Sequence, residues 1–354
     1  MAQAHAGPMP WWAWLFPILG VAALAVGKGL PAPVTLALLM GCVFASVRHA
    51  ETVATRLGEP LGTLVLALAV TVLEAGMIVS MMMGGSGPTV ARDAIFAALM
   101  IALNGIIGLS LVLGGARHFA QSFRAPAANA FLAVLVPLSV LTLVLPTYTV
   151  TTPGPLFATP QLVFVAVVAL LLYGCFLYVQ LVRHRADFLA DHDIEAAPAD
   201  RPAKGSTAVA AVLLAISLAA VILLAKMLSP ALEAGVAAIG APAAMVGVAI
   251  ATLVLLPEGI TAVKAAARNN LQTALNLALG SIAACIGLTI PVVAVVALIL
   301  GEPLHLGLEP AMTALLATTY LMLAITLNTG RTTVLEGIVH LSVFAAFLMF
   351  TFLP

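Results

Sequence analysis

Charged residues are scarce in this chain: Asp, Glu, Lys and Arg make up 8% of its 354 residues, whereas a soluble domain carries about 25%. The two signs balance at fourteen residues each, so the charge does not favour a nucleic-acid partner. The three cysteines are scattered without ligand spacing, which argues against a disulfide framework. A nucleotide-binding loop, an HExxH pair and a plausible nucleophile–His pair are all missing, so the sequence predicts neither an enzyme nor ATP-driven transport by this chain alone.

Apolar residues take the place of the missing charges and form 63% of the chain. A helix needs about 20 apolar residues to cross a bilayer. The sequence therefore predicts an all-α polytopic membrane protein with about 11 transmembrane helices, at roughly 11–27, 31–47, 60–83, 94–115, 128–145, 160–182, 207–228, 242–263, 273–300, 310–328 and 333–352. The first run has no Lys or Arg before it, so we expect a retained helix, anchored by three tryptophans, rather than a cleaved signal.

The basic residues predict the orientation of these helices. If the N-terminus is cytoplasmic, eleven basic residues fall in inside loops: Arg48, Arg56, Arg117, Arg124, Arg183, Arg185, Arg201, Lys204, Lys264, Arg268 and Arg331. Only three fall outside: Lys28, Arg92 and Lys226. Because cytoplasmic loops are enriched in Lys and Arg, this bias predicts an odd number of spans, with the C-terminus periplasmic.

One long polar segment divides the chain. We predict an N-terminal transmembrane helix (1–30), a first five-helix repeat (31–182), a cytoplasmic polar linker (183–206) and a second five-helix repeat (207–354). Since five is odd, the two repeats must have opposite orientations, an architecture typical of transporters. The competing interpretation is that any chain this hydrophobic can be divided into five helices plus five.

Two glutamates lie deep in apolar runs, each in the second helix of its half: Glu74 and Glu258. A carboxylate in hydrocarbon costs about 2.5–3.5 kcal/mol on insertion scales, so it is retained only where it has a partner, and it commonly marks an ion pathway. We predict that both bind Ca²⁺ or Na⁺ and protons. The alternative is a protonated structural Glu74, and a Glu258 that snorkels to the surface near Lys264.

The surroundings of these acids suggest further site-lining residues. Thr71 and Thr261 each lie three residues from a glutamate, on the same helical face. Pro257 removes a backbone donor and frees a carbonyl oxygen, a ligand suited to hard cations. Asn104 and Ser281, in the helices that follow, are possible site-lining residues, although tight helix packing explains most small residues there.

Two weaker signals lie near the end of the chain. His340 falls in the last span, where it could relay protons or, more simply, form a structural hydrogen bond. Arg331 and Glu336 could form a gate pair near the cytoplasmic face.

Three segments, in this order along the chain, resemble those of a known family: RHAETVATRLGEPLGTLVLALAVTVLEAGMI, LLPEGITAVKAAARNNLQTALNLALGS and NTGRTTVLEGIVHLSVFAAFLM. From about Arg48 to its end the chain resembles bacterial calcium/sodium–proton antiporters of the ChaA type, in the calcium/cation antiporter superfamily. This resemblance implies two inverted five-helix repeats, often with one extra N-terminal helix. It also implies one essential acid in the second helix of each repeat, at Glu74 and Glu258.

The chain departs from the superfamily pattern around those acids. Gly280-Ser281 is kept, but the Asn expected three residues before each acid is replaced by Thr71 and by Leu255, and the expected Ser, Asn and Gln are replaced by Ile101, Ala102 and Ala284. Fewer side-chain oxygens argue against strict Ca²⁺ selectivity and leave Na⁺ or K⁺ exchange open.

Together these observations predict a secondary active cation/proton antiporter of the bacterial plasma (inner) membrane. It would exchange Ca²⁺, Na⁺ or K⁺ for H⁺ by alternating access at a paired-glutamate site. Its expected partners are the lipid bilayer and the transported ions, without nucleic acid, nucleotide or bound cofactor. The main alternative is a cation channel that uses the same acids; a receptor or an intramembrane enzyme is a third possibility.

Overall fold

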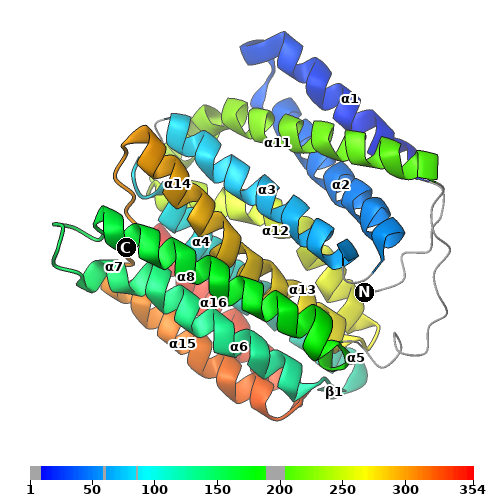
Figure 1. The fold of residues 1–354 in the computed structure, drawn as a ribbon, viewed down its shortest axis with the longest axis vertical. Helices are drawn as coiled ribbons and strands as arrows, with labels where there is room; N and C mark the ends of the chain where they lie inside the picture. The colour runs from blue at the N-terminus through cyan, green and yellow to red at the C-terminus, as the bar shows by residue number, and fades with distance from the viewer. Residues whose placement is uncertain (1–8, 59–60, 85–86, 189–203) are drawn as a thin grey trace. The chain divides into compact units, whose positions relative to one another are not determined.

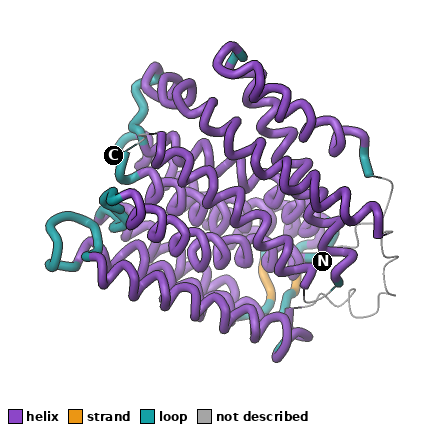
Figure 2. Tube along the Cα trace, turned by 45° about the horizontal axis from the view of Figure 1, so that its top comes forward, coloured by secondary structure: helices purple, strands orange, loops and turns teal. Residues whose placement is uncertain are grey.

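A computed structural model of the chain describes residues 9–58, 61–84, 87–188 and 204–354. These residues form long helices joined by short loops (Figures 1 and 2). The α-helices are α1 (Trp11–Val26), α2 (Ala32–Leu57), α3 (Leu61–Gly84), α4 (Val90–Met100), α5 (Ile107–His118), α6 (Ala125–Ser139), α7 (Leu145–Tyr148), α8 (Thr159–Tyr178), α9 (Arg185–Phe188), α11 (Lys204–Ala238), α12 (Ala244–Ala267), α13 (Leu271–Ala284), α14 (Ile290–Leu300), α15 (Pro310–Asn328) and α16 (Val334–Phe352). The strands are β1 (Gln121–Ser122) and β2 (Arg331–Thr332).

Four π-helical turns interrupt or end these helices: η2 (Ile101–Ile106), η3 (Val140–Val144), η4 (Val179–Arg183) and η5 (Cys285–Thr289). A short 3₁₀ turn, η1 (Gly27–Gly29), follows α1. A π-turn inserts one extra residue into a helix and is often found at functional sites. Simple hydrophobic periodicity does not predict such turns, so they are a finding of the structure alone.

The predicted all-α membrane architecture is confirmed. Among the described residues, ten helical stretches are long and apolar enough to cross a membrane, and α1 is a shorter apolar helix. Each coincides with one of the eleven predicted runs. Some ends were wrong: α2 continues to Leu57, well beyond residue 47, because Ala50 and Ala54 keep one face of its polar last turns buried. The central part of the linker, 189–203, lies outside the described residues.

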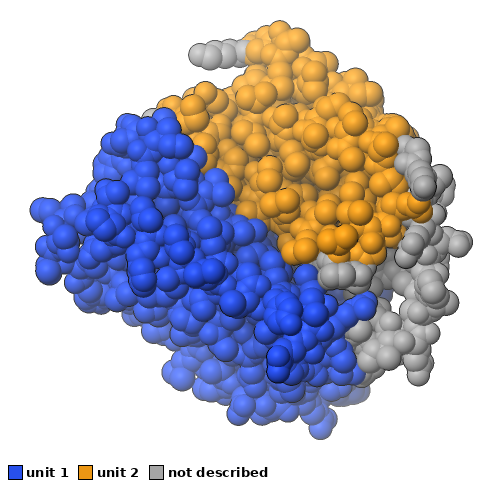
Figure 3. Space-filling view, in the orientation of Figure 1, with its two compact units in different colours: residues 1–2, 87–194, 241–354 blue, residues 3–86, 195–240 orange. Residues whose placement is uncertain are grey.

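The chain divides into two compact units, coloured separately in Figure 3. They comprise residues 1–2, 87–194 and 241–354 (unit 1) and residues 3–86 and 195–240 (unit 2). Each unit contains helices from both predicted repeats, so packing groups the helices differently from the division at 31–182 and 207–354. The two repeats therefore stay a prediction.

Unit 2 contains α1, α2, α3 and α11, which pack closely through small residues. A Cβ atom on Gly41 of α2 would overlap the Phe16 ring of α1, and one on Gly76 of α3 would lie 2.4 Å from Ile222 of α11. The Sγ of Cys42 donates a hydrogen bond to the Phe16 carbonyl over 3.2 Å. Small residues let helix backbones approach where lipid offers no hydrophobic driving force.

At one end of unit 1, hydrogen bonds connect the loops around β1, α9 and β2 and the turn between α12 and α13. β1 pairs with β2, with Gln121 opposite Thr332. The Gln121 amide also donates to the Ala266 carbonyl over 2.8 Å. Arg124 donates to the Ala186 carbonyl over 3.0 Å. These loops were all predicted to be cytoplasmic.

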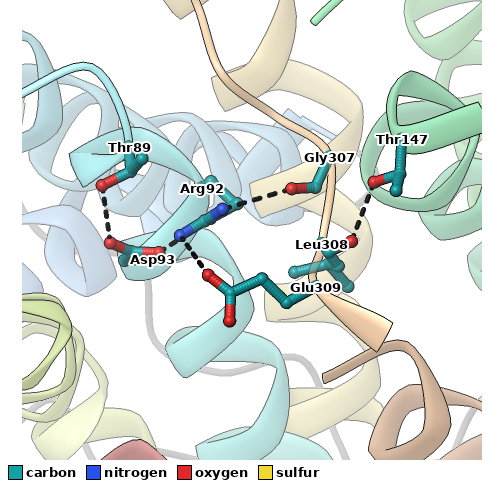
Figure 4. A network of polar contacts seen from close by, with 7 residues as sticks. All are labelled: Thr89, Arg92, Asp93, Thr147, Gly307, Leu308 and Glu309. Atoms are coloured by element: carbon teal, nitrogen blue, oxygen red, sulfur yellow. Dashed lines mark hydrogen bonds and ion pairs between the residues drawn. The ribbon is translucent and has the colours of Figure 1, made fainter. Parts of the chain in front are cut away.

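At the other end of unit 1, the 301–309 loop is held against α4 and the 145–158 segment (Figure 4). Arg92 donates to the Gly307 carbonyl over 3.2 Å and lies 3.8 Å from the Glu309 carboxylate. Thr147 donates to the Leu308 carbonyl over 2.8 Å. These loops were all predicted to be periplasmic. Since loops predicted to share a side are in contact, the helices of unit 1 alternate in direction as expected; which side is cytoplasmic stays a prediction.

Labelling of introduced cysteines will test that assignment. Ser122 of β1 and Val150, which is 97% exposed, mark the two ends of unit 1. In a variant whose Cys42, Cys175 and Cys285 are replaced by alanine, we expect a membrane-impermeant maleimide to label Val150→Cys on intact cells. Ser122→Cys should be labelled only after the membrane is opened. The cysteine-free variant is the control, and the reverse pattern would overturn the orientation.

A glycine pair will test the close packing within unit 1. A Cβ on Gly247 of α12 would lie 3.0 Å from backbone atoms of Asp93 and Ala94 in α4, whereas Gly174 of α8 has open space. We expect Gly247→Ala to lower the thermal unfolding temperature in detergent, by an overpacking cost of about 1–3 kcal/mol. Gly174→Ala should be neutral or stabilising, because Ala is favoured in a helix by about 1 kcal/mol. Equal effects of the two changes would contradict the packing argument.

Candidate cation site

Glu258 lies in the second half of α12, directly after Pro257. Proline has no N–H, so the helical hydrogen bond to the Leu253 carbonyl cannot form. The Ser281 hydroxyl of α13 donates a hydrogen bond to the Glu258 carboxylate. The other feature of this carboxylate is its Oε2 atom, which is buried and has no hydrogen-bond partner among the described residues. Buried polar atoms are rarely left unpaired, so an unpaired carboxylate oxygen points to a proton or a cation as its partner.

Two glycines lie beside the residues of this site, Gly259 next to Glu258 and Gly280 next to Ser281. A Cβ on Gly259 would lie 3.1 Å from the Cδ1 of Ile106, in the π-turn η2. On α13, a Cβ on Gly280, the neighbour of Ser281, would be 3.8 Å from the Phe131 ring. Glu258 and Ser281, predicted as ligand and lining residue, are therefore brought together, with η2 beside them.

The hydroxyl of Thr261, a predicted lining residue, bonds its own helix rather than the Glu258 carboxylate. Its Oγ1 donates to the Pro257 carbonyl of the same helix over 2.9 Å, and its side chain is exposed. Pro257 itself is buried in α12. Hydroxyls that bond back to their own helix in this way are common and often accompany a bend.

Glu74 lies in α3, in unit 2, and its side chain is 9% exposed. Thr71, one turn earlier, is also buried, and its hydroxyl donates to the Ala67 carbonyl over 2.9 Å. A hydroxyl that donates to its own helix keeps lone pairs that can accept or coordinate. Thr71 therefore remains a candidate lining residue of the Glu74 site.

Asn104 is fully buried in η2 and is bonded to two other helices rather than to Glu258. Its Nδ2 donates to Thr319 of α15 over 2.8 Å, and its Oδ1 lies 3.0 Å from the Nδ1 of His340 in α16. The Nε2 of His340 lies 3.2 Å from the Thr326 hydroxyl. Thus Asn104 and His340 share one polar network. The sequence analysis missed Thr319 and Thr326, although a hydroxyl residue in an apolar span is the signal that could have found them.

Glu336, predicted as a gate partner of Arg331, instead bonds Thr333. The Glu336 carboxylate accepts hydrogen bonds from the Thr333 amide and hydroxyl, at 2.9 and 2.6 Å. This capping box starts α16 and satisfies amides at its first turn. Glu336 therefore stabilises a helix end, and its role as a gate partner of Arg331 has no support.

Membrane-length helices packed through glycines, a proline-interrupted helix and an unpaired buried carboxylate oxygen are features of a membrane ion transporter. The profile of the family described as sodium/calcium exchanger protein matches residues 33–182 and 209–353. The chain belongs to this family, within the calcium/cation antiporter superfamily. The same profile matches each half separately, as a duplicated unit would predict.

Two relatives match nearly the whole chain. A protein of Sinorhizobium fredii named as putative ionic transporter y4hA is 48% identical over 362 residues, which cover 99% of each chain. The sodium-potassium/proton antiporter ChaA of Escherichia coli is 36% identical over 351 residues, which cover 96% of this chain and 95% of that protein. The resemblance inferred from three sequence segments is therefore confirmed.

Solved structures share the fold at lower identity. The Ca²⁺/H⁺ antiporter protein YfkE superposes with a TM-score of 0.74 at 18% identity, over 97% of this chain and 99% of that one. The H⁺/Ca²⁺ exchanger CAX gives 0.73 at 14% identity, over 95% and 86%. At these identities the likeness establishes the fold alone.

A serine variant will test the Glu258 site. Since a ligand that binds the folded state raises thermal stability, a bound cation should protect the protein from unfolding. We expect Ser281→Ala to weaken the apparent cation affinity in a thermal-shift titration with Ca²⁺, Na⁺ or K⁺ by about tenfold, as loss of a ligand-orienting hydrogen bond commonly does. The control is Ser217→Ala, because that buried hydroxyl donates only to Leu213 of its own helix. Unchanged affinity in Ser281→Ala would remove Ser281 from the site.

Proposed function

We propose that this protein is a secondary active cation/proton antiporter of a bacterial inner membrane that exchanges Ca²⁺, Na⁺ or K⁺ for H⁺. Membership of an exchanger family supports the cation-exchange class. The names of its relatives and fold neighbours support the coupling to protons: one is a sodium-potassium/proton antiporter, others Ca²⁺/H⁺ exchangers. The observation that carries the proposal is the buried, unpaired Oε2 of Glu258.

The mechanism follows from the cost of charge in a medium of low dielectric. An ionised carboxylate buried in such a medium costs several kcal/mol unless a cation or a proton neutralises it. In our proposal, Glu74 and Glu258 act as one functional pair that a metal ion or protons neutralise in turn. Both cargoes then compete for the same oxygens, so that neither carboxylate stays charged and unpaired during the transport cycle. Exposure of the loaded sites to alternate sides moves each cargo across.

The neutral oxygens around Glu258 bear on which cation is carried. Among the described residues, no group of three His, Cys, Asp or Glu side chains could hold a metal ion together. A transported cation would therefore complete its shell with hydroxyl oxygens such as that of Ser281, backbone carbonyls and water. Such an oxygen set suits hard cations such as Ca²⁺, and the relative named as a sodium-potassium/proton antiporter supports monovalent cargo as well. This supports an exchanger that is not restricted to Ca²⁺.

The decisive experiment is cation-dependent proton movement in proteoliposomes, read with a pH-sensitive dye while Ca²⁺, Na⁺ and K⁺ are added separately. We expect Glu74→Gln and Glu258→Gln each to abolish it, because Gln keeps the volume and removes the charge. Glu→Asp at either position should retain activity with weaker affinity. The double Gln variant should be no worse than either single one, because the two carboxylates act as one unit. Glu302→Gln, in an exposed loop, is the control.

The same assay has a pH dependence with a definite sign. Protons and cations compete for the carboxylates, and raising the pH removes the competing protons. The apparent cation affinity should therefore rise as the pH rises. A near wild-type rate in either Gln variant would remove that glutamate from the mechanism. A cation conductance without obligatory proton counterflow would instead identify a channel.

A further inference from the structure

A chain of hydrogen bonds in unit 1 links three helices through fully buried side chains. Asn104, Thr319 and His340 are 0% exposed and Thr326 is 2% exposed. The chain runs from Thr326 (α15) to His340 (α16), then to Asn104 (η2) and back to Thr319 (α15), with heavy-atom distances of 3.2, 3.0 and 2.8 Å. The proposed exchange mechanism does not use these side chains.

The shortest bond of each donor defines the direction of the chain; the Met100 sulfur lies farther off, 3.7 Å from the Asn104 Nδ2 and 3.6 Å from the Thr319 Oγ1. Asn104 donates through Nδ2 to Thr319, so its Oδ1 accepts, and the Nδ1 of His340 must carry the proton that it receives. The Nε2 of His340 is then an acceptor for the Thr326 hydroxyl. Thr319 donates its own proton to the Leu315 carbonyl over 2.8 Å. A neutral His340 with its proton on Nδ1 therefore satisfies every bond.

The network fixes the π-turn that contacts the helix of Glu258. Asn104 lies inside η2, and Ile106 of the same turn fills the space over Gly259, the residue after Glu258. Gly108, at the start of α5 directly after η2, packs closely on α16: a Cβ on Gly108 would lie 3.1 Å from the His340 Cβ. The position of η2 between α16 and α12 thus connects His340 to the Glu258 site.

Directional hydrogen bonds can hold a π-turn in one register, which apolar packing alone does not specify. Reversion of η2 to a regular α-helix would rotate Asn104 away from His340 and shift Ile106 along α12. Breaking the network therefore removes what selects the π-turn, even where the apolar packing is kept.

We propose that Asn104 and His340 are positioning residues for the Glu258 site: their hydrogen bond holds η2 in its π-turn and thereby sets the Ile106–Gly259 contact beside the carboxylate. This inference rests on the proposed function, since its consequence is the affinity of Glu258 for the transported cation. The two side chains touch neither the ion nor the carboxylate. Their effect is on affinity rather than on the exchange step.

Leucine substitutions separate positioning from stability. The variants are His340→Leu, Asn104→Leu and the double variant, with half-saturating cation concentration, maximal exchange rate and unfolding temperature measured for each. We expect each single variant to raise the half-saturating concentration about tenfold, the usual effect of a residue that orients a ligand, with the maximal rate kept. The double variant should regain part of the stability, since Asn104 and His340 no longer leave one another buried and unpaired, although the Thr326 hydroxyl still loses its acceptor; its half-saturating concentration should stay raised. Recovery of wild-type affinity in the double variant would overturn the proposal, because it would show that the Asn104–His340 bond serves stability alone.

A conservative variant and a matched control complete the test. His340→Gln keeps one donor and one acceptor, so it should bring the half-saturating concentration within about threefold of wild type, less than the tenfold loss expected without the bond. Loss of proton movement in His340→Gln would overturn positioning in favour of a proton relay. Thr351→Val is the control on α16, because that buried hydroxyl donates only to Phe347 of its own helix.

Comparison with Glu258→Gln in the same vesicles distinguishes the two proposals. Absence of cation-dependent proton movement in wild-type vesicles refutes the proposed function, whereas exchange that persists in Glu258→Gln removes only Glu258 from the mechanism. A dead Glu258→Gln together with unchanged affinity in His340→Leu and Asn104→Leu refutes only the positioning role.

Discussion

The low dielectric of the membrane interior is the constraint on which the rest of this structure depends. A polar group inside hydrocarbon must find a partner within the protein. Many of the buried hydroxyls find one in their own helix, as Thr71, Ser217 and Thr351 do. Asn104 and His340 find one between helices. The Oε2 of Glu258 has none among the described residues; the Ser110 hydroxyl and the Gln121 Oε1 share this state in unit 1, but of the three only the carboxylate can carry a charge.

Irregular helix geometry occurs where these polar groups are placed. Pro257 interrupts the hydrogen bonding of α12 next to Glu258, and η2 places Asn104 opposite His340. The third helix of each predicted repeat carries a π-turn near its middle, η2 in one and η5 in the other. A regular helix commits every internal backbone group, so only an interrupted one offers free carbonyls or an altered register to a site. In an exchanger, such an interruption can offer backbone atoms to an ion, while the regular parts of the same helix keep the site rigid.

Much of this was accessible from the sequence. Eleven apolar runs predicted α1 and the ten membrane-length helices of the described residues, and three sequence segments predicted the family. Ser281 was predicted as a possible lining residue in the helix that follows Glu258, and it does bond Glu258. Thr261 was chosen by spacing, but its hydroxyl bonds Pro257 instead. Spacing places a side chain on a helical face but does not say which of two available acceptors its hydroxyl will use.

The sequence by itself determined that this protein folds in a membrane, the number and order of its helices, and the positions of the two acids, Glu74 and Glu258, within apolar helices. These are properties of composition and local periodicity, which each segment carries alone. Only the tertiary structure decided that Asn104 meets His340 across 236 positions of chain, that η2 is a π-turn and that Ile106 covers Gly259. Those features depend on which helix faces which, and that is fixed by the joint packing of all helices in the unit rather than by any one segment.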